Sequence, residues 1–282
     1  MTTADTHGRA ADGRTVTGLG CVGAVERRMS DLLPGAGCAG PDVFLADLAA
    51  IRAAAAAGFD PVLYFAVRDV LPPRVSFPVS SDDGPEGLKL SADLVIYQDG
   101  VLPGGEPFRS IGHWNPAGQL EIFQVLSGRV LMLTSGISIG GRPFARYQEC
   151  RVGDVAVVPF GAWHLTYALD GPAIVFNIYT SPCGGAGPPQ GGKGEPAGMA
   201  KYHSERGPAQ IAAAREDGGL RFVMGPEASW SGRPAAVSCP AWLRVFLPAG
   251  ASLPGWCAQA SDAELRELEA AARVAAGSGW PS

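Results

Sequence analysis

The sequence has no run of 18 apolar residues, so no segment of it predicts a membrane-spanning helix. Charged residues are sparse, at 17% of the chain, and the 27 acidic residues outnumber the 22 basic ones. The basic patch that is typical of duplex-binding proteins is therefore missing. The six cysteines are scattered without a C-x-x-C pair, which argues against a zinc knuckle. Residues 1–20 are polar and lack the apolar core of a signal peptide, so we expect a cytoplasmic protein.

What the chain does contain favours a folded, turn-rich β protein. Its 282 residues are 46% hydrophobic, which is enough for a sizeable core and argues against overall disorder. Its 39 glycines and 24 prolines make up roughly a fifth of the chain. Such a density of helix breakers does not suit a helical bundle, whereas a protein of short strands and many turns needs it.

The patterning predicts four regions along the chain. The first is a loose arm without sustained periodicity, and the second is a barrel preceded by a helix and an extended segment. A stretch rich in glycine and proline follows as a linker or flap, and a C-terminal extension packs on the barrel. The expected boundaries are 1–40, 41–180, 181–198 and 199–282.

Helices are expected near both ends of the folded part. The alanine-rich segment 41–58 places Phe44, Leu45, Leu48 and Ile51 at helical spacing. Near the C-terminus, Ser261 and Glu264 form a capping box that opens a helix over 262–276. We expect that helix to pack through three side chains, which are Leu265, Leu268 and Val274.

Most of the remaining chain predicts strands at even spacing, as in a sandwich or barrel. Ser127-Gly128 is interpreted as a hairpin turn and Asp170-Gly171 as a second turn. A short αβ piece is expected over 208–223. The predicted strands cover 61–71, 88–97, 121–126, 129–134, 155–159, 164–169, 173–179 and 242–247.

Two of the four histidines lie in an ordered pattern of residues. The pattern reads G-H-x-N-x5-E-x6-G and then G-x5-P-x-G-x2-H, and it resembles the two-part signature of the cupin barrel. The matching residues are Gly112, His113, Asn115, Glu121, Gly128, Gly153, Pro159, Gly161 and His164. The resemblance implies a mainly β fold, a cupin barrel of the double-stranded β-helix or jelly-roll type.

Within the cupins, the sequence is similar to the glucose-6-phosphate isomerases of archaea. The similarity is carried by Asp60–Tyr64, by the strand ending in Val95-Ile96-Tyr97, and by Ser110–His113. It covers roughly residues 42–180 and, more loosely, 200–230. The resemblance implies a divalent metal ion held by His113, Glu121 and His164, with Fe(II) favoured and Mn, Ni or Zn as alternatives.

Three positions depart from the family pattern. The second histidine of the family's pair is Asn115 here, and a carboxamide oxygen is a weaker ligand than imidazole for these metals. Asn115 is therefore expected to be a weak or absent ligand, which leaves the two histidines and the glutamate. The family's tyrosine two residues after the glutamate is Phe123, and a threonine of its phosphate pocket is Leu94. The remaining contacts that the resemblance implies with substrate fall on Tyr64, Ser110, Gly112 and Phe123.

Three functions remain open. The first is a metal-dependent, isomerase-like enzyme for a sugar phosphate or related hydroxy-carbonyl compound, in which Glu121 is the catalytic general base. The second is a non-haem Fe(II) oxygenase or lyase that uses the His/His/Glu set. The third is a non-catalytic cupin that binds a small molecule. In each case we expect a small-molecule ligand, no nucleic-acid or membrane partner, and, from the resemblance, a homodimer.

Overall fold

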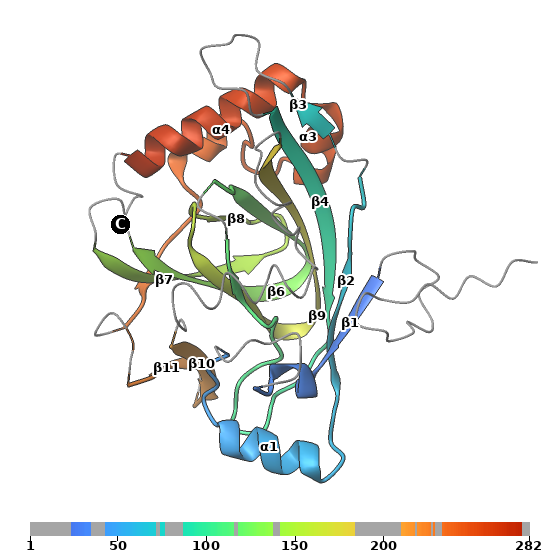
Figure 1. Cartoon of the computed structure of the whole chain (residues 1–282), viewed down its shortest axis with the longest axis vertical. Helices are drawn as coiled ribbons and strands as arrows, with labels where there is room; N and C mark the ends of the chain where they lie inside the picture. Colours follow the sequence, from blue (N-terminus) through green and yellow to red (C-terminus); the bar gives the residue numbers. More distant parts are fainter. Residues whose placement is uncertain are drawn as a thin grey trace, which may run out of the picture.

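A computed structural model gives the fold of the chain (Figure 1), and it describes most residues between 24 and 277. The described ranges are 24–34, 43–71, 74–76, 87–115, 118–137, 142–183, 210–217, 219–226, 228 and 233–277. The linker predicted over 181–198 therefore lies outside them, apart from the backbone of 181–183, and so do His7 and His203. Within this part of the chain, no helix combines the length and the apolarity that crossing a membrane requires.

The core of the molecule is a large, strongly curved sheet with the order β1-β2-β4-β9-β6-β7-β12, in which all pairs are antiparallel except the parallel pair of β7 and β12. Three short strands join it from the side: β3 pairs with β4, β5 with β9, and β8 with β6. The strand bounds are β1 Ala24–Arg28, β2 Val62–Val67, β3 Arg74–Ser76, β4 Gly87–Tyr97, β5 His113–Trp114, β6 Glu121–Ile137, β7 Pro143–Arg151, β8 Val155–Val158, β9 Trp163–Cys183 and β12 Ala235–Ala236.

Two long strands, β6 and β9, carry the curvature. Each runs through both walls of the barrel, since the first half of β6 pairs with β8 and its second half with β7. Likewise, the first half of β9 pairs with β5 and its second half with β4. The two strands also pair with each other along most of their length. This arrangement confirms the prediction of a mainly β, cupin-type barrel.

The predicted hairpin at Ser127-Gly128 and the predicted turn at Asp170-Gly171 are wrong, because β6 and β9 continue through both sites. The register shifts around Ser127, which is typical of β-bulges that bend a strand. Gly128 has φ +76° and Gly171 has φ +61°, so glycines occupy both bends. At Gly128 the strands also approach closely, since a Cβ there would lie 2.7 Å from the carbonyl oxygen of Pro172.

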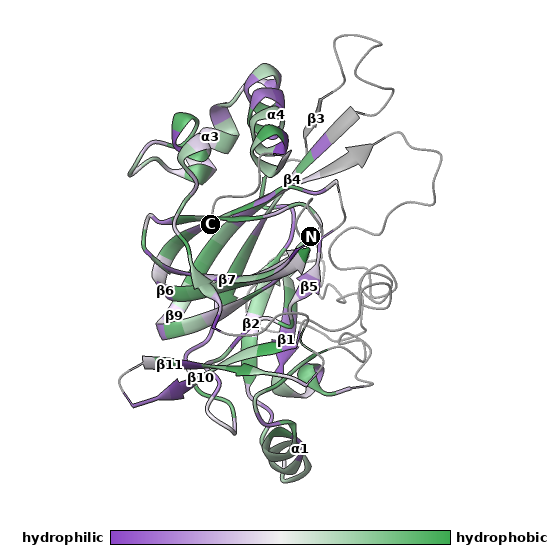
Figure 2. Ribbon diagram, turned by 90° about the vertical axis from the view of Figure 1, so that its left-hand side faces the viewer, coloured by the Kyte–Doolittle hydropathy of each residue, from purple (hydrophilic) through white to green (hydrophobic). Residues whose placement is uncertain are grey.

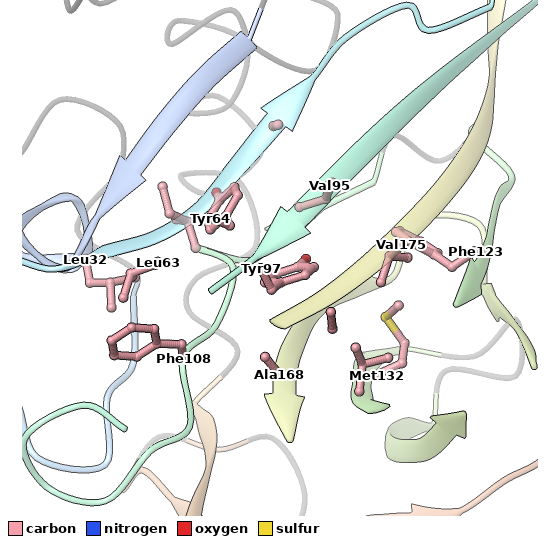
Figure 3. Close-up of a cluster of buried hydrophobic side chains, with 14 of the residues drawn as sticks. Leu32, Leu63, Tyr64, Val95, Tyr97, Phe108, Phe123, Met132, Ala168 and Val175 are labelled. Carbon is pink, nitrogen blue, oxygen red and sulfur yellow. The ribbon is translucent and has the colours of Figure 1, made fainter. Parts of the chain in front are cut away.

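Side chains along β6 and β9 alternate between the barrel interior and its outer faces. The interior is filled by an apolar cluster that includes Tyr97 and Val175, and part of this cluster is drawn in Figure 3. On one outer face, Ile122 and Phe176 pack against the C-terminal helices. On the other, Leu133 and Leu165 pack against a separate hairpin. Both outer faces are therefore covered by the chain itself.

The covering elements lie at opposite ends of the molecule (Figures 1 and 2). Helices α3 and α4 lie at one end, and the β10–β11 hairpin lies towards the other, near α1. These elements and the 3₁₀ helices have the bounds η1 Met29–Leu32, α1 Leu48–Ala56, β10 Ile211–Glu216, β11 Gly219–Met224, η3 Ala241–Val245, α3 Leu253–Gln259 and α4 Asp262–Gly277.

Two N-terminal expectations need correction. Residues 24–32, within the segment expected to be loose, form β1 and η1, because β1 pairs with β2 along its whole length. The helix expected over 41–58 begins only at Leu48, after Asp47 caps it by accepting a 2.9 Å hydrogen bond from the Ala50 amide. The preceding residues 43–47 are irregular and end in a turn, and buried Glu106 and Arg109 bind the Ala46 amide and the Phe44 carbonyl there.

The C-terminal expectations are partly confirmed. The capping box of Ser261 and Glu264 is formed, and α4 buries Leu265 and Leu268. Val274 is 74% exposed, so its predicted packing role is wrong, and Ala272 takes the third buried position. The αβ piece expected over 208–223 is the β10–β11 hairpin instead, and the strand expected over 242–247 is the 3₁₀ helix η3.

Candidate metal centre

The short strand β5 places His113 directly opposite His164 of β9. Residues opposite each other in an antiparallel pair share a face of the sheet, and the two imidazole rings have centroids 4.3 Å apart. Gly112 allows this approach. It has φ +80°, and a Cβ there would lie 2.9 Å from the Trp163 ring and 3.1 Å from the His164 carbonyl oxygen. The glycine of the motif is therefore needed for close packing.

Glu121 opens β6 and joins the histidines from the neighbouring strand. Its Oε2 lies 3.6 Å from Nε2 of His164, and the candidate ligand atoms of His113, Glu121 and His164 all lie within 4.8 Å of one another. Glu121 and His164 are buried and His113 is half-buried. The structure thus brings together the three residues that the sequence pattern singled out as metal ligands. That they hold a metal stays a prediction.

Burial keeps His164 neutral, since desolvation lowers its pKa from 6.5 to about 3. Although its Nε2 lies within ion-pair distance of Glu121, the contact is therefore not an ion pair at neutral pH. The Nδ1 atom of His164 is buried without a hydrogen-bond partner among the described residues. A neutral imidazole is the form that binds metal ions, so the protonation state of this side chain fits a ligand role.

Two carboxamides that the sequence pattern did not indicate hold the glutamate. Asn177 of β9 donates a 2.8 Å hydrogen bond to Oε1 of Glu121, and Gln119 donates a longer one, 3.4 Å, to Oε2. Asn177 lies opposite Phe123 in the β6–β9 register, and this long-range pairing cannot be read from the sequence. Such outer partners fix the orientation of a ligating carboxylate.

Asn115, the expected weak ligand, is buried beside this group. Its backbone amide bonds to the carbonyl of Ala162, and its side-chain oxygen accepts a 3.2 Å hydrogen bond from Gln119. The oxygen that could coordinate a metal thus already has a donor. This geometry is consistent with a weak ligand and leaves the prediction standing.

The residues expected to contact substrate fall in different environments. Phe123 lines the candidate site, with its ring 5.5 Å from that of His164. Tyr64 packs against Tyr97, with ring centroids 5.5 Å apart, and burial raises the pKa of Tyr64. Figure 3 draws both rings. The Ser110 hydroxyl accepts a 3.0 Å hydrogen bond from the Thr166 amide, which ties it to β9. For Gly112, Ser110 and Tyr64 these contacts are structural ones, and a substrate role stays a prediction.

Leu94, at the position of the family's threonine, packs on the outer face with the cluster that meets the C-terminal helices. It therefore faces away from His113, Glu121 and His164.

The donor set suits a first-row divalent ion. Two imidazoles and one carboxylate are common ligands of iron, manganese, nickel and zinc, and a three-residue set leaves coordination positions for water or substrate. A fully buried carboxylate such as Glu121 is costly without charge compensation, and a bound cation would provide it. The residues present therefore fit a divalent metal.

No protein-family model and no curated protein matches the sequence. Solved structures of cupins do show similarity. An oxalate oxidase in complex with glycolate has 22% identity and a TM-score of 0.24, and the alignment covers 32% of this chain and 41% of the oxidase chain. Oxalate decarboxylase from Bacillus subtilis at pH 4.6 has 21% identity and a TM-score of 0.26, and the alignment covers 33% of this chain and 25% of the decarboxylase chain. KdgF from Halomonas sp. has 17% identity and a TM-score of 0.25, covering 40% of this chain and 83% of its own.

The chain thus spans less than half the length of the oxalate oxidase and a quarter of the decarboxylase. The assignment of the fold rests on the pairing of β4, β6 and β9 with their neighbours.

Proposed function

We propose that this protein is a metal-dependent enzyme that acts on a small sugar phosphate or hydroxy-carbonyl compound by isomerase-like proton transfer. The observation that carries the proposal is the convergence of His113, Glu121 and His164 from three strands, with all ligand atoms within 4.8 Å in the barrel interior. The order of the same residues in a cupin-type motif supports it independently. We propose one divalent ion, with Fe(II) favoured.

Each residue around the candidate metal centre has a separate role in the proposed reaction. When bound, the divalent ion supplies Lewis-acid polarisation of the substrate's oxygen atoms. Glu121 moves a proton between adjacent substrate carbons as general base. Asn177 and Gln119 hold its two carboxylate oxygens, so the orientation of the base is fixed before the substrate enters. Phe123 excludes water from one side of the site.

A second candidate function is a non-haem Fe(II) oxygenase or lyase. One observation favours it: the side-chain oxygen of Asn115 is bound by Gln119, which leaves a set of two histidines and one carboxylate. That set is associated with open-sited Fe(II) centres. A cupin that only binds a small molecule remains the third alternative.

Three measurements on the full chain separate these functions. Elemental analysis of the purified protein should find about one divalent ion per chain. An isomerase should then exchange substrate C–H hydrogens with deuterated solvent under anaerobic conditions, and Glu121→Gln should abolish that exchange. Oxygen consumption with Fe(II) and no anaerobic exchange would instead establish the oxygenase. Metal without either reaction would leave the binding protein, and absence of metal would refute the proposal.

The sequence-based expectations of a cytoplasmic location and of a homodimer remain proposals as well. Size-exclusion chromatography with light scattering tests the homodimer directly.

A further inference from the structure

A second polar group lies in the barrel interior beside the candidate metal centre. Asp93 of β4 is completely buried, and its carboxylate forms an ion pair of 2.5 Å with Nη1 of Arg68, at the end of β2. The other carboxylate oxygen accepts a hydrogen bond from the Asp69 amide. The arginine side chain is 27% exposed, so it connects this interior group with solvent.

Strand register connects this group to the metal centre. Asp93 lies directly opposite Asn177, and Asn177 lies directly opposite Phe123, so all three side chains share the interior face. Asn177 is also the residue that bonds to Glu121 at 2.8 Å. From Phe123 on β6 to Asp93 on β4 there are two strand spacings, which is about 10 Å.

Two buried side-chain atoms near Asp93 have no hydrogen-bond partner among the described residues. They are Oδ1 of Asn177 and Nε of Arg68. The orientation of the Asn177 amide is determined by Glu121, because a carboxylate accepts hydrogen bonds and must face the amide nitrogen. Asn177 therefore presents an acceptor to the interior, and Arg68 presents a donor. Unpaired buried polar atoms are costly, and a ligand with the complementary groups would satisfy both.

The charges favour one kind of anion. Arg68 is cationic and Asp93 already offsets its charge, while Glu121 is a second carboxylate nearby. A single carboxylate fits the remaining donors of a guanidinium side-on. A phosphate dianion would bring two negative charges, one more than a carboxylate, to a region that already holds the carboxylates of Asp93 and Glu121.

We infer that Arg68 and Asn177 form a substrate subsite that takes the carboxylate and a hydroxyl group of a small hydroxy-carbonyl acid. Arg68 binds the carboxylate near the solvent side, Asn177 accepts from a hydroxyl, and the far end of the molecule reaches His113, Glu121 and His164. The inference rests on the proposed function, since it names the substrate class for the same site.

Three probes with one six-carbon skeleton test the subsite: gluconate, sorbitol 6-phosphate and neutral sorbitol. Their affinities are measured by calorimetry on the full chain, metal-loaded and metal-free. The test variant is Arg68→Gln combined with Asp93→Asn, because the single change would leave a buried carboxylate without its partner. Arg129→Gln is the matched control, since Arg129 forms a surface ion pair with Asp170. Asn177→Leu tests the hydroxyl contact.

Wild type should bind gluconate about 10- to 100-fold more tightly than sorbitol, as expected for a charge-assisted hydrogen bond. The double variant should lose this preference and keep its metal, whereas the control should retain both. In the metal-free titrations, Asn177→Leu should weaken gluconate and sorbitol alike, and unchanged affinity for both would overturn the hydroxyl contact. Equal affinity of wild type for gluconate and sorbitol, or an unchanged preference in the double variant, would overturn the inference. Tighter binding of sorbitol 6-phosphate would overturn the carboxylate assignment.

Failure of the proposed function would give a different result from failure of the subsite. If wild type holds no metal, that function is wrong, and the metal-free titrations still decide whether Arg68 selects a carboxylate.

Discussion

Asn177 and Glu121 are 56 residues apart in the chain, yet the amide of one donates a 2.8 Å hydrogen bond to the carboxylate of the other inside the barrel. The bond fixes one of the two glutamate oxygens, so the candidate ligand has a defined orientation. We therefore expect Asn177→Leu to lower metal affinity by about 10- to 100-fold, the usual effect of losing an outer partner of a ligand. Chelator competition measures this change. Ser135→Ala, which removes a buried hydroxyl on the outer side of β6, should leave the affinity unchanged.

Replacing the candidate ligands one at a time should show how much each contributes to metal binding. His164→Ala should abolish metal retention, because it removes an imidazole from a three-residue set. Asn115→Ala should lower retention only slightly, while Asn115→His should tighten binding, because imidazole is a better ligand than a carboxamide for first-row transition metals. Elemental analysis after dialysis gives the order. If Asn115→Ala loses metal as completely as His164→Ala does, the site has four ligands and the oxygenase alternative loses its main support.

The metal-free protein should lose stability in acid because of His164. Burial lowers the pKa of His164 to about 3 in the folded state, against 6.5 for the ordinary group. Between these values the unfolded chain binds a proton that the folded protein does not. The free energy of unfolding should therefore be undiminished above pH 6.5 and fall as the pH drops towards 3, by up to about 1.4 kcal/mol per pH unit. Urea unfolding across this range measures the slope.

The control for this pH effect is His164→Gln, which removes the titrating group and keeps the other three histidines. A slope in that variant equal to the slope of wild type would show that another residue is responsible.

Gln124 contributes two hydrogen bonds to the attachment of the C-terminal helices to the barrel. Gln124 of β6 donates a 2.7 Å hydrogen bond to the Ala251 carbonyl and accepts another of 2.7 Å from the Leu253 amide. We expect Gln124→Ala to increase hydrogen exchange in α3 and α4, because both anchoring bonds are lost. Gln148→Ala removes a hydrogen bond within the barrel only, to Val155, and should leave exchange in these helices unchanged.

Gly128 is required in the bend of β6 for two reasons, its positive φ and the close approach of the neighbouring strand. Gly153, outside β6, shares only the first. Gly128 and Gly153 both have positive φ, but a Cβ at Gly128 would meet the Pro172 carbonyl at 2.7 Å, whereas nothing lies within 4 Å at Gly153. Gly153→Ala should therefore cost only the backbone strain, about 1–2 kcal/mol of unfolding free energy. Gly128→Ala should cost more, because the strands must also separate. Equal shifts in denaturant midpoint would show that the close approach is unimportant.

The sequence predicted the barrel and the three candidate ligands because both depend on local spacing. His113, Glu121 and His164 stand at fixed distances from glycines that shape the chain around them, such as Gly112. Asn177 and Arg68 were not predicted, because their places in the interior follow from long-range strand register. The hairpin at Ser127-Gly128 was wrong for a related reason. Its glycine has the positive φ of a turn, but it lies in a bend whose continuation depends on pairing with β9.

Helix α3 was missed because Pro254 and Gly255 are usually helix breakers. Here Ser252 caps the helix and proline falls in its first turn, where the absent amide hydrogen costs nothing. The burial of Leu253 and Cys257 against the barrel then stabilises a helix of low intrinsic propensity. Tertiary packing of this kind leaves no signal in the local sequence.

The covered outer faces of the barrel limit how two copies of this chain could associate. One face is occupied by the C-terminal helices and the other by the β10–β11 hairpin, so stacking of sheet on sheet between copies would first have to displace part of the chain. Among the described residues, the edge strand β1 offers another route, since it pairs only with β2. That edge carries Glu26, Arg27 and Arg28, and charged side chains discourage edge-to-edge pairing. Among the described residues, loops and helix surfaces are therefore where we expect a homodimer to form, and its contacts should be more polar than those of stacked sheets.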